Sequence, residues 1–191
     1  INADFPVLFL LHGLFGSCDN WLDLTEIREY CEELEMIIVL VEGGNGWYSD
    51  SDTIETEKFY SYFIEELLPE IRLEYRIDQR KQAIAGLSMG GYGAFKFGLN
   101  RPDLFCFVGS MSGAFVAPNL CGADDDSRFS ELLPSINDVF GNSNSINEND
   151  LFQIIDGLSP EEIETLPFFY FDCGIEDAFL SVNQKMADLL Q

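Results

Sequence analysis

The sequence has few basic side chains and no long apolar run. Ten Lys and Arg stand against 34 Asp and Glu among 191 residues, which gives a net charge of −24. A surface with this excess of carboxylates repels phosphate backbones and anionic headgroups, so we expect no nucleic-acid partner and no membrane partner. The longest apolar runs, such as residues 7–11 and 36–41, are far shorter than the roughly 20 residues that cross a bilayer. The hydrophobic content of 47% instead indicates a globular domain with a sizeable core.

Metal-binding and disulfide patterns are also missing. The sequence has one histidine, His12, and five cysteines without a C-x-x-C pair. Zinc sites use closely spaced thiolates and imidazoles, so we expect no metal and no cofactor. We interpret the cysteines as free, mostly buried thiols: Cys18, Cys31, Cys106, Cys121 and Cys173.

The start of the sequence lacks an initiator methionine and a targeting segment. Ile1 is followed within a few residues by an apolar strand pattern, with no charged region or cleavage site before it. We therefore expect a fragment of a longer protein. The sequence does not identify a cellular compartment.

What the sequence does contain is an alternation of short apolar runs with segments of helical periodicity. This alternation is typical of right-handed βαβ units around a mainly parallel sheet with helices on both faces, so the predicted fold class is α/β. Strands are predicted at residues 6–11, 36–41, 83–85, 105–108 and 168–171. Helices are predicted at residues 21–35, at 59–71 with a kink at Pro69, from 90 onward, and at 179–189.

The interval 114–166 breaks this alternation. It includes an acidic run at 124–126 and a polar stretch at 142–145. We expect a single domain over residues 1–191, in which 114–166 forms a lid-like insertion over one face of the sheet.

The pentapeptide Gly86-Leu87-Ser88-Met89-Gly90 matches the pattern G-x-S-x-G between a predicted strand and a predicted helix. A sharp strand-to-helix turn brings backbone segments close together, and glycines at both flanking positions leave room for this approach. The turn would raise the serine hydroxyl above the carboxyl edge of the sheet, where ligand crevices lie. The amide of Met89 would then point to the position of an acyl oxygen. The alternative is a glycine-rich turn whose serine merely caps the helix.

A second motif follows the first predicted strand. His12-Gly13-Leu14-Phe15-Gly16 lies where enzymes with such a serine turn place their other oxyanion donor. The backbone N–H of Leu14 is the donor that we expect.

Several stretches together resemble one family. They are LLHGLFGSCDNW, EGGNGWYSDS, FIEELLPEIRLEYRID, AIAGLSMGGYGAFKFGLNRPDLF and DCGIEDAFL. These stretches look like the α/β-hydrolase esterases grouped with esterase D, S-formylglutathione hydrolase, tributyrin esterase and the mycolyltransferases. The resemblance extends from about Phe5 to about Leu190, and its most specific block is 83–105.

The resemblance implies roles for individual residues. Ser88 would be the nucleophile, Leu14 and Met89 would donate the oxyanion hydrogen bonds, and Asp177 would be the acid of the triad. The residues themselves also favour Asp177, because it follows the strand 168–171 across a turn and should lie at the same sheet edge as Ser88. Asp172 and Glu176 are the alternative acids. A solvated carboxylate near a helix start is the simpler interpretation of Asp177.

The catalytic base does not follow this pattern. In such a family the histidine comes after the acid, whereas the only histidine here is His12. We expect His12 to shape the oxyanion loop. Because a serine hydroxyl is a weak nucleophile without a base, we expect this chain to be nearly inactive and to lack the last strand, the histidine loop and the closing helix.

The segment 42–48 is rich in glycine but matches neither G-x-G-x-x-G nor a P-loop. We interpret it as a loop that lines the acyl pocket, with Trp47 and Tyr48 as candidate substrate contacts. Core packing is the commoner role of such aromatic residues.

Together these features predict a serine carboxylesterase that cleaves a small-molecule ester or thioester through an acyl-enzyme. An acyltransferase of the same family differs only in the acceptor. A non-catalytic α/β-hydrolase-like binding domain is the alternative from another class, since the fold alone does not establish function. The sequence is compatible with a homodimer.

Overall fold

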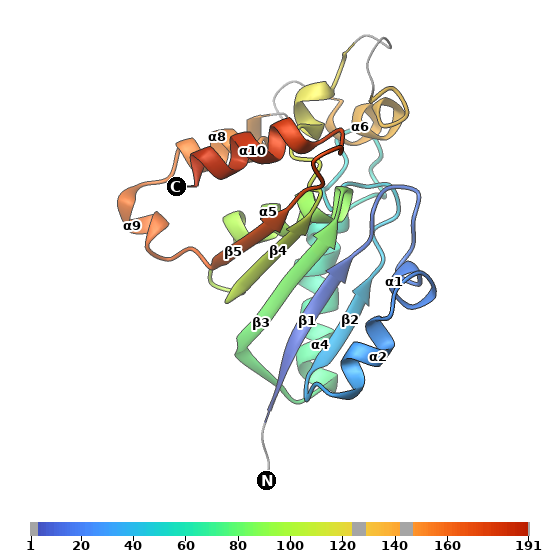
Figure 1. Cartoon of the computed structure of the whole chain (residues 1–191), viewed down its shortest axis with the longest axis vertical. Coiled ribbons are helices and arrows are strands. Elements are labelled where there is room, and N and C mark those ends of the chain that lie inside the picture. The colour runs from blue at the N-terminus through green and yellow to red at the C-terminus, as the bar shows by residue number, and fades with distance from the viewer. Residues whose placement is uncertain (1–3, 124–128, 142–146, 191) are drawn as a thin grey trace.

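Five parallel strands form one sheet in the order β2-β1-β3-β4-β5 (Figure 1). The computed structural model describes residues 4–123, 129–141 and 147–190. The predicted α/β class with a mainly parallel sheet is confirmed. The strands are β1 (Phe5–Leu11), β2 (Ile37–Val41), β3 (Ile77–Leu87), β4 (Phe107–Met111) and β5 (Phe168–Asp172).

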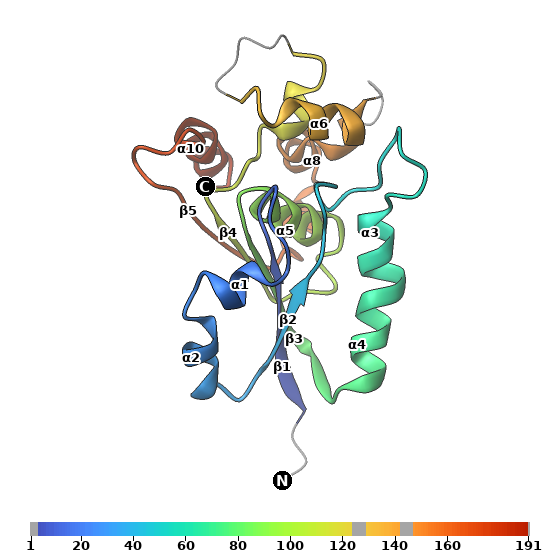
Figure 2. The same ribbon diagram turned by 90° about the vertical axis from the view of Figure 1, so that its right-hand side faces the viewer.

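Helices cover both faces of the sheet, as predicted. One side carries α1 (Asn20–Asp23) and α2 (Ile27–Glu32), and the other carries α3 (Phe59–Ser61), the π-helix η1 (Tyr62–Leu67) and α4 (Leu68–Glu74) (Figure 2). Helix α5 (Met89–Asn100) lies on the same side as α3, because the Phe97 ring is 5.0 Å from Tyr60 and 4.4 Å from Phe63.

Two predicted helices differ in detail from those observed. The helix expected at 21–35 is divided into α1 and α2. Between them the Thr25 hydroxyl donates to the Trp21 carbonyl and accepts from the Ile27 N–H, so it competes with the helical backbone bonds. The helix expected at 59–71 is irregular before Pro69 and not at it. Proline lacks an N–H and is tolerated in the first turn of α4, while the preceding turns are the π-helix.

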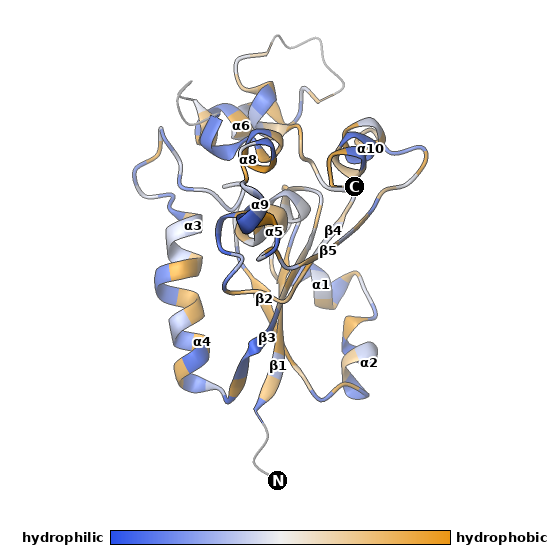
Figure 3. Cartoon of the chain, turned by 90° about the vertical axis from the view of Figure 1, so that its left-hand side faces the viewer, coloured by the Kyte–Doolittle hydropathy of each residue, from blue (hydrophilic) through white to orange (hydrophobic). Residues whose placement is uncertain are grey.

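The core lies between the sheet and the layer formed by α3 to α5. Alternate residues of β1, Val7, Phe9 and Leu11, are fully buried against this layer. The Phe9 ring contacts Phe63 at 5.1 Å between centroids. Figure 3 shows hydrophobic residues concentrated in the central strands, while α4 alternates between hydrophobic and hydrophilic positions.

The interval 114–166 contains several short helices, and α6 lies beyond the carboxyl ends of the strands (Figure 1). The acidic run 124–126 and the polar stretch 142–145 lie outside the described residues. The role of this interval as a lid stays a prediction. Its helices are η2 (Ala117–Leu120), α6 (Leu133–Phe140), α8 (Leu151–Asp156) and α9 (Pro160–Ile163), and β5 then leads to α10 (Leu180–Leu189).

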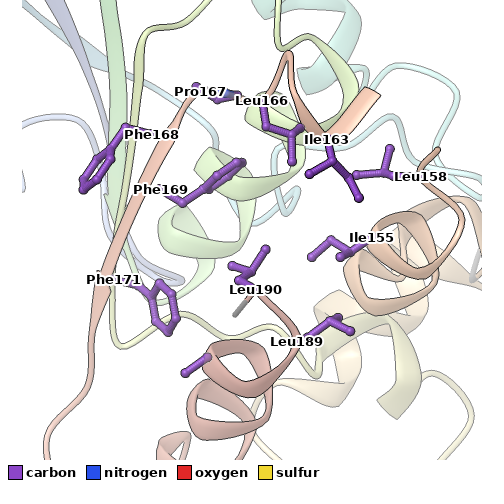
Figure 4. Close-up of a pocket in the computed structure, with 11 residues that line it drawn as sticks. Ile155, Leu158, Ile163, Leu166, Pro167, Phe168, Phe169, Phe171, Leu189 and Leu190 are labelled. Carbon is purple, nitrogen blue, oxygen red and sulfur yellow. The ribbon is translucent and has the colours of Figure 1, made fainter. Parts of the chain in front are cut away.

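An apolar cavity of about 700 Å³ lies along β5, between this strand and α8, α9 and α10 (Figure 4). Phe169, Phe171 and Leu190 are among its lining side chains. None of the predicted site residues lines it.

The cysteines are free, as predicted, but they are less buried than predicted. Cys106 is exposed and the other four are half-buried. Over the residues that the structure describes, no helix is long and apolar enough to cross a membrane.

Candidate active site

The two sequence motifs meet at the carboxyl edge of the sheet. Strand β1 lies between β2 and β3. The connection from β1 leads to β2 and the connection from β3 leads to β4, so the two run toward opposite edges of the sheet. Such a switch point is where open α/β sheets bind ligands. Leu11 pairs with Gly86, and a Cβ built on Gly13 would lie 3.7 Å from the Ser88 Cβ. The loop after β1 is therefore next to the serine.

Ser88 lies on a strained strand-to-helix turn. Its φ is 56° and its ψ is −111°, in a region that side chains with a Cβ rarely adopt. A Cβ on Gly86 would lie 2.3 Å from the carbonyl of Gly90, and a Cβ on Gly90 would lie 2.3 Å from the Leu11 carbonyl oxygen. Both glycines of the motif are thus required by close backbone approach.

Three backbone hydrogen bonds hold Ser88 in this conformation. Its N–H donates to the Met111 carbonyl at 2.9 Å, and its carbonyl accepts from the N–H of Tyr92 at 3.0 Å and of Ala114 at 3.1 Å. Ser88 occupies the N-cap position of α5, but its side chain makes no capping hydrogen bond. The simple capping interpretation of the motif is therefore wrong in this structure, and the hydroxyl is left half-buried at the sheet edge.

The two predicted oxyanion donors flank the serine. Met89 is the first residue of α5, where a backbone N–H has no partner within the helix. Within residues 4–123, 129–141 and 147–190, no protein acceptor bonds the N–H of Leu14 or Met89. The next N–H groups of the loop are occupied, since Phe15 donates to the Asn45 side chain and Gly16 donates to the Gly13 carbonyl.

His12 is buried and ties the loop after β1 to the loop after β2. Its Nδ1 lies 2.8 Å from the Gly13 carbonyl oxygen, and its Nε2 accepts from the Gly43 N–H at 3.0 Å. Its Nε2 also lies 3.2 Å from Glu42 Oε1, so the ring contacts Glu42 as well as the two glycines. The geometry agrees with the expected role of His12 in shaping the loop. Both ring nitrogens are engaged away from Ser88.

Glu42, which the sequence did not single out, supports the same loop. Partial burial raises the pKa of the Glu42 carboxyl. Hydrogen bonds from the N–H groups of Gly44 and Cys18, together with the nearby His12, lower this pKa by a larger amount, so the net shift is downward. The bond from Cys18 joins groups that are 24 residues apart, so no local pattern in the sequence indicates it.

Trp47 and Tyr48 lie beneath the site, with both side chains buried and both φ angles positive. The Tyr48 hydroxyl donates to the His12 carbonyl at 3.1 Å. The Trp47 indole donates to the Ser135 hydroxyl at 3.0 Å. These contacts make both residues parts of the core under the loop, and substrate contact stays a prediction.

The candidate acids lie at the end of β5 or in the loop that follows it, two strands away from the strand that precedes Ser88. Asp177 is half-buried, and its carboxylate accepts from the Phe179 N–H at 2.7 Å near the start of α10. Asp172 is exposed and accepts from the Tyr170 hydroxyl, and Glu176 is exposed. Since neighbouring strands lie about 4.8 Å apart, roughly 10 Å separates the axes of β3 and β5. Strand β4 lies between them.

A small cavity of about 190 Å³ adjoins the serine turn. It lies between the loop after β1, the α1 segment and Leu87, the residue before Ser88. Its lining is mainly apolar and includes Leu14, Trp21, Leu24 and Leu87.

Comparison with known proteins gives consistent matches. The sequence model of a family described as "Putative esterase" matches residues 2–153. An acetyl esterase from Caldicellulosiruptor saccharolyticus is 30% identical over 198 residues, covering 100% of this chain and 73% of that protein.

Solved structures show the same fold. FphF, a fluorophosphonate-binding serine hydrolase from Staphylococcus aureus, superposes with a TM-score of 0.84 at 25% identity, covering 100% of this chain and 72% of that one. An S-formylglutathione hydrolase from Agrobacterium tumefaciens gives a TM-score of 0.78 at 24% identity, covering 100% of this chain and 73% of that one.

Proposed function

This chain belongs to that esterase family and has the α/β-hydrolase fold, and from this premise we propose that it is a serine carboxylesterase domain acting on a small ester or thioester. The family match and the esterase neighbours support carboxylic ester hydrolysis. The observation that carries the proposal is the strained Ser88 together with the N–H groups of Leu14 and Met89, which have no acceptor in the part of the chain that the structure describes.

In the proposed mechanism, the Ser88 oxygen attacks the ester carbonyl and its proton passes to a base. The carbonyl oxygen becomes an oxyanion, which accepts hydrogen bonds from the N–H groups of Leu14 and Met89. The alcohol or thiol then leaves with a proton, which forms an acyl-enzyme. Water attacks this intermediate, releases the carboxylic acid and restores the Ser88 hydroxyl. Asp177 would orient the base.

The small cavity beside Ser88 supports a compact substrate. Its volume of about 190 Å³ is below the 300–1,000 Å³ typical of sites for drug-sized ligands. We propose that it receives a short acyl group, because its lining is mainly apolar and includes Leu14 and Leu87, the residue before Ser88. Hydrolysis rates for esters and thioesters of increasing acyl length would distinguish the substrate classes.

Labelling with a fluorophosphonate tests the nucleophile. With imidazole added to serve as the base, we expect the probe to modify Ser88, identified by mass spectrometry of the tryptic peptide, and Ser88→Ala to remove the label. Ser112→Ala is the matched control, because Ser112 follows the neighbouring strand β4 and also has a positive φ, of 49°, and its loss should leave labelling intact. A label that persists in Ser88→Ala contradicts the proposal.

A non-catalytic binding domain is the second candidate. The observation that favours it is the state of His12, the sequence's only histidine, whose ring nitrogens are engaged by Gly13 and Gly43. Added imidazole separates the two functions. A serine site that lacks only its base should label faster with imidazole, whereas a binding domain should not respond. Products formed with added alcohols would reveal acyl transfer.

A further inference from the structure

One peptide group, between Gly113 and Ala114, connects Ser88 to a helix on the far side of the site. The N–H of this group belongs to Ala114 and donates to the Ser88 carbonyl at 3.1 Å. Its carbonyl belongs to Gly113 and accepts from the Asn183 side-chain amide at 2.9 Å. Both Gly113 and Ala114 are buried. The bonds therefore form a continuous chain from Asn183 to Ser88.

The orientation of the Asn183 amide follows from its surroundings. The same Nδ2 donates to the Gly113 carbonyl and to the Phe179 carbonyl, each at 2.9 Å. A flipped amide would place its oxygen against two carbonyl oxygens, so the nitrogen must face them. Asn183 lies in α10 and is 3% exposed. Because Asn183 is buried and both of its amide protons are used, its side-chain amide has a single orientation.

We infer that Asn183 is a positioning residue for the nucleophile, and this inference rests on the proposed role of Ser88. A strained φ persists only where the surrounding structure holds it in place. Of the three backbone bonds that hold Ser88, one comes from the Tyr92 N–H in its own helix α5 and one goes to the Met111 carbonyl at the end of β4. The third comes from the loop after β4, and Asn183 fixes that loop.

The loop after β4 needs such an anchor because it is itself unusual. Ser112 has a φ of 49°, and a Cβ on Gly113 would lie 2.5 Å from the Phe115 ring and from the Ser110 hydroxyl. Without Asn183 the Gly113 carbonyl would be buried with no donor among the described residues, which costs free energy. Polarisation of the peptide by Asn183 also strengthens the bond that Ala114 donates.

Amide hydrogen exchange measured by NMR tests the inference in the 191-residue chain. Asn183→Leu and the nearly isosteric Asn183→Asp both remove the donor. We expect each to speed exchange of the Ala114 amide by about tenfold, the loss of one buried hydrogen bond, while amides of β1 and β3 keep their rates. Gln184→Leu is the control, because Gln184 is the exposed neighbour on the same helix. It should leave Ala114 unchanged.

The rate of fluorophosphonate labelling at Ser88 gives the second measurement, and it should fall in both Asn183 variants but not in Gln184→Leu. Unchanged Ala114 exchange in both variants overturns the inference. Faster exchange spread evenly over all core amides also overturns it, because Asn183 would then contribute only to global stability. A parent chain that does not label at Ser88 even with added imidazole counts against the proposed function instead, since the exchange result does not depend on chemistry.

Discussion

Gly86 and Gly90 approach each other so closely that a Cβ on Gly86 would lie 2.3 Å from the Gly90 carbonyl carbon and oxygen. No real Cβ contact is that short, and the obstacle is backbone, which cannot rotate away. The spacing of the serine motif is therefore a packing requirement as well as a signature. Close backbone packing at the sheet edge, and not the chemistry of the serine, limits which residues can flank position 88.

Gly86→Ala should destabilise the fold. The added methyl group must displace the start of α5 from β3, and such overpacking costs about 1–3 kcal/mol of unfolding free energy. Urea unfolding followed by circular dichroism measures the loss. Gly174→Ala is the control, because its Cβ would meet only the Asp177 Cβ at 3.8 Å. Equal losses in the two variants would contradict the packing argument.

Ser88→Gly should stabilise the chain relative to Ser88→Ala. Both variants lack the hydroxyl and should lose fluorophosphonate labelling. Only glycine relieves the positive φ of 56°, and strain of this kind costs about 1–3 kcal/mol, partly offset by the greater freedom of glycine when unfolded. A higher thermal midpoint for Ser88→Gly is the expected result. A higher midpoint for Ser88→Ala would show that the turn is not strained.

Lys96 gives the fold an unusual dependence on pH. It lies buried in α5, where its ammonium contacts the Ser49 hydroxyl and the Asn149 side chain and faces the Tyr60 ring. Burial lowers the pKa of Lys96 to about 7, although the carboxylates of Asp50, Asp52 and Glu148 act in the opposite direction.

Between about pH 7 and about pH 9, the unfolded chain holds a proton on this lysine that the folded chain has released. Stability should therefore rise with pH over this range. Lys96→Met keeps the length of the side chain and should remove the rise in unfolding free energy. The range ends below pH 10, because burial raises the pKa of Tyr92 and Tyr48 and reverses the trend there. Parallel pH profiles for the parent chain and Lys96→Met would refute the assignment.

Glu42 should have the opposite effect at acid pH. Its pKa is lower in the folded chain than its ordinary value of 4.5. Its ionised form therefore adds stability above that value, and the contribution is lost as the pH falls through the folded pKa. Glu42→Gln should be less stable than the parent chain at neutral pH, and the difference should shrink in acid. Urea midpoints of the two proteins across this range provide the measurement.

The positions of the strands could be predicted because parallel strands that are buried on both faces have short, nearly continuous apolar runs in the sequence. Strand β3 is longer than predicted, and its first part shows why. Asp78 and Arg80 are polar and pair with each other at an irregular part of the strand, where the register shifts between Phe5 and Val7. Apolar periodicity cannot reveal a strand segment that is held by backbone hydrogen bonds while its side chains are polar and exposed to solvent.

The candidate site was predictable only in part. Ser88, Leu14 and Met89 belong to local motifs, and the structure brings them together at one sheet edge. Asn183 belongs to no motif. Its one signal is a polar residue on the stripe of α10 that also carries Phe179 and Met186, and such a pattern does not tell which carbonyl the amide meets.

The contact between Gly90 and the Leu11 carbonyl also bears on the order in which the chain folds. The strained turn is held by β1 and by the loop after β4, both distant from it in sequence, while the bond from the Tyr92 N–H to the Ser88 carbonyl is local. Parallel pairings of this kind close large loops and form slowly. We expect a refolding chain to keep residues 86–90 relaxed until the central strands have paired. Ser88 would then reach its final geometry only as the last strands dock.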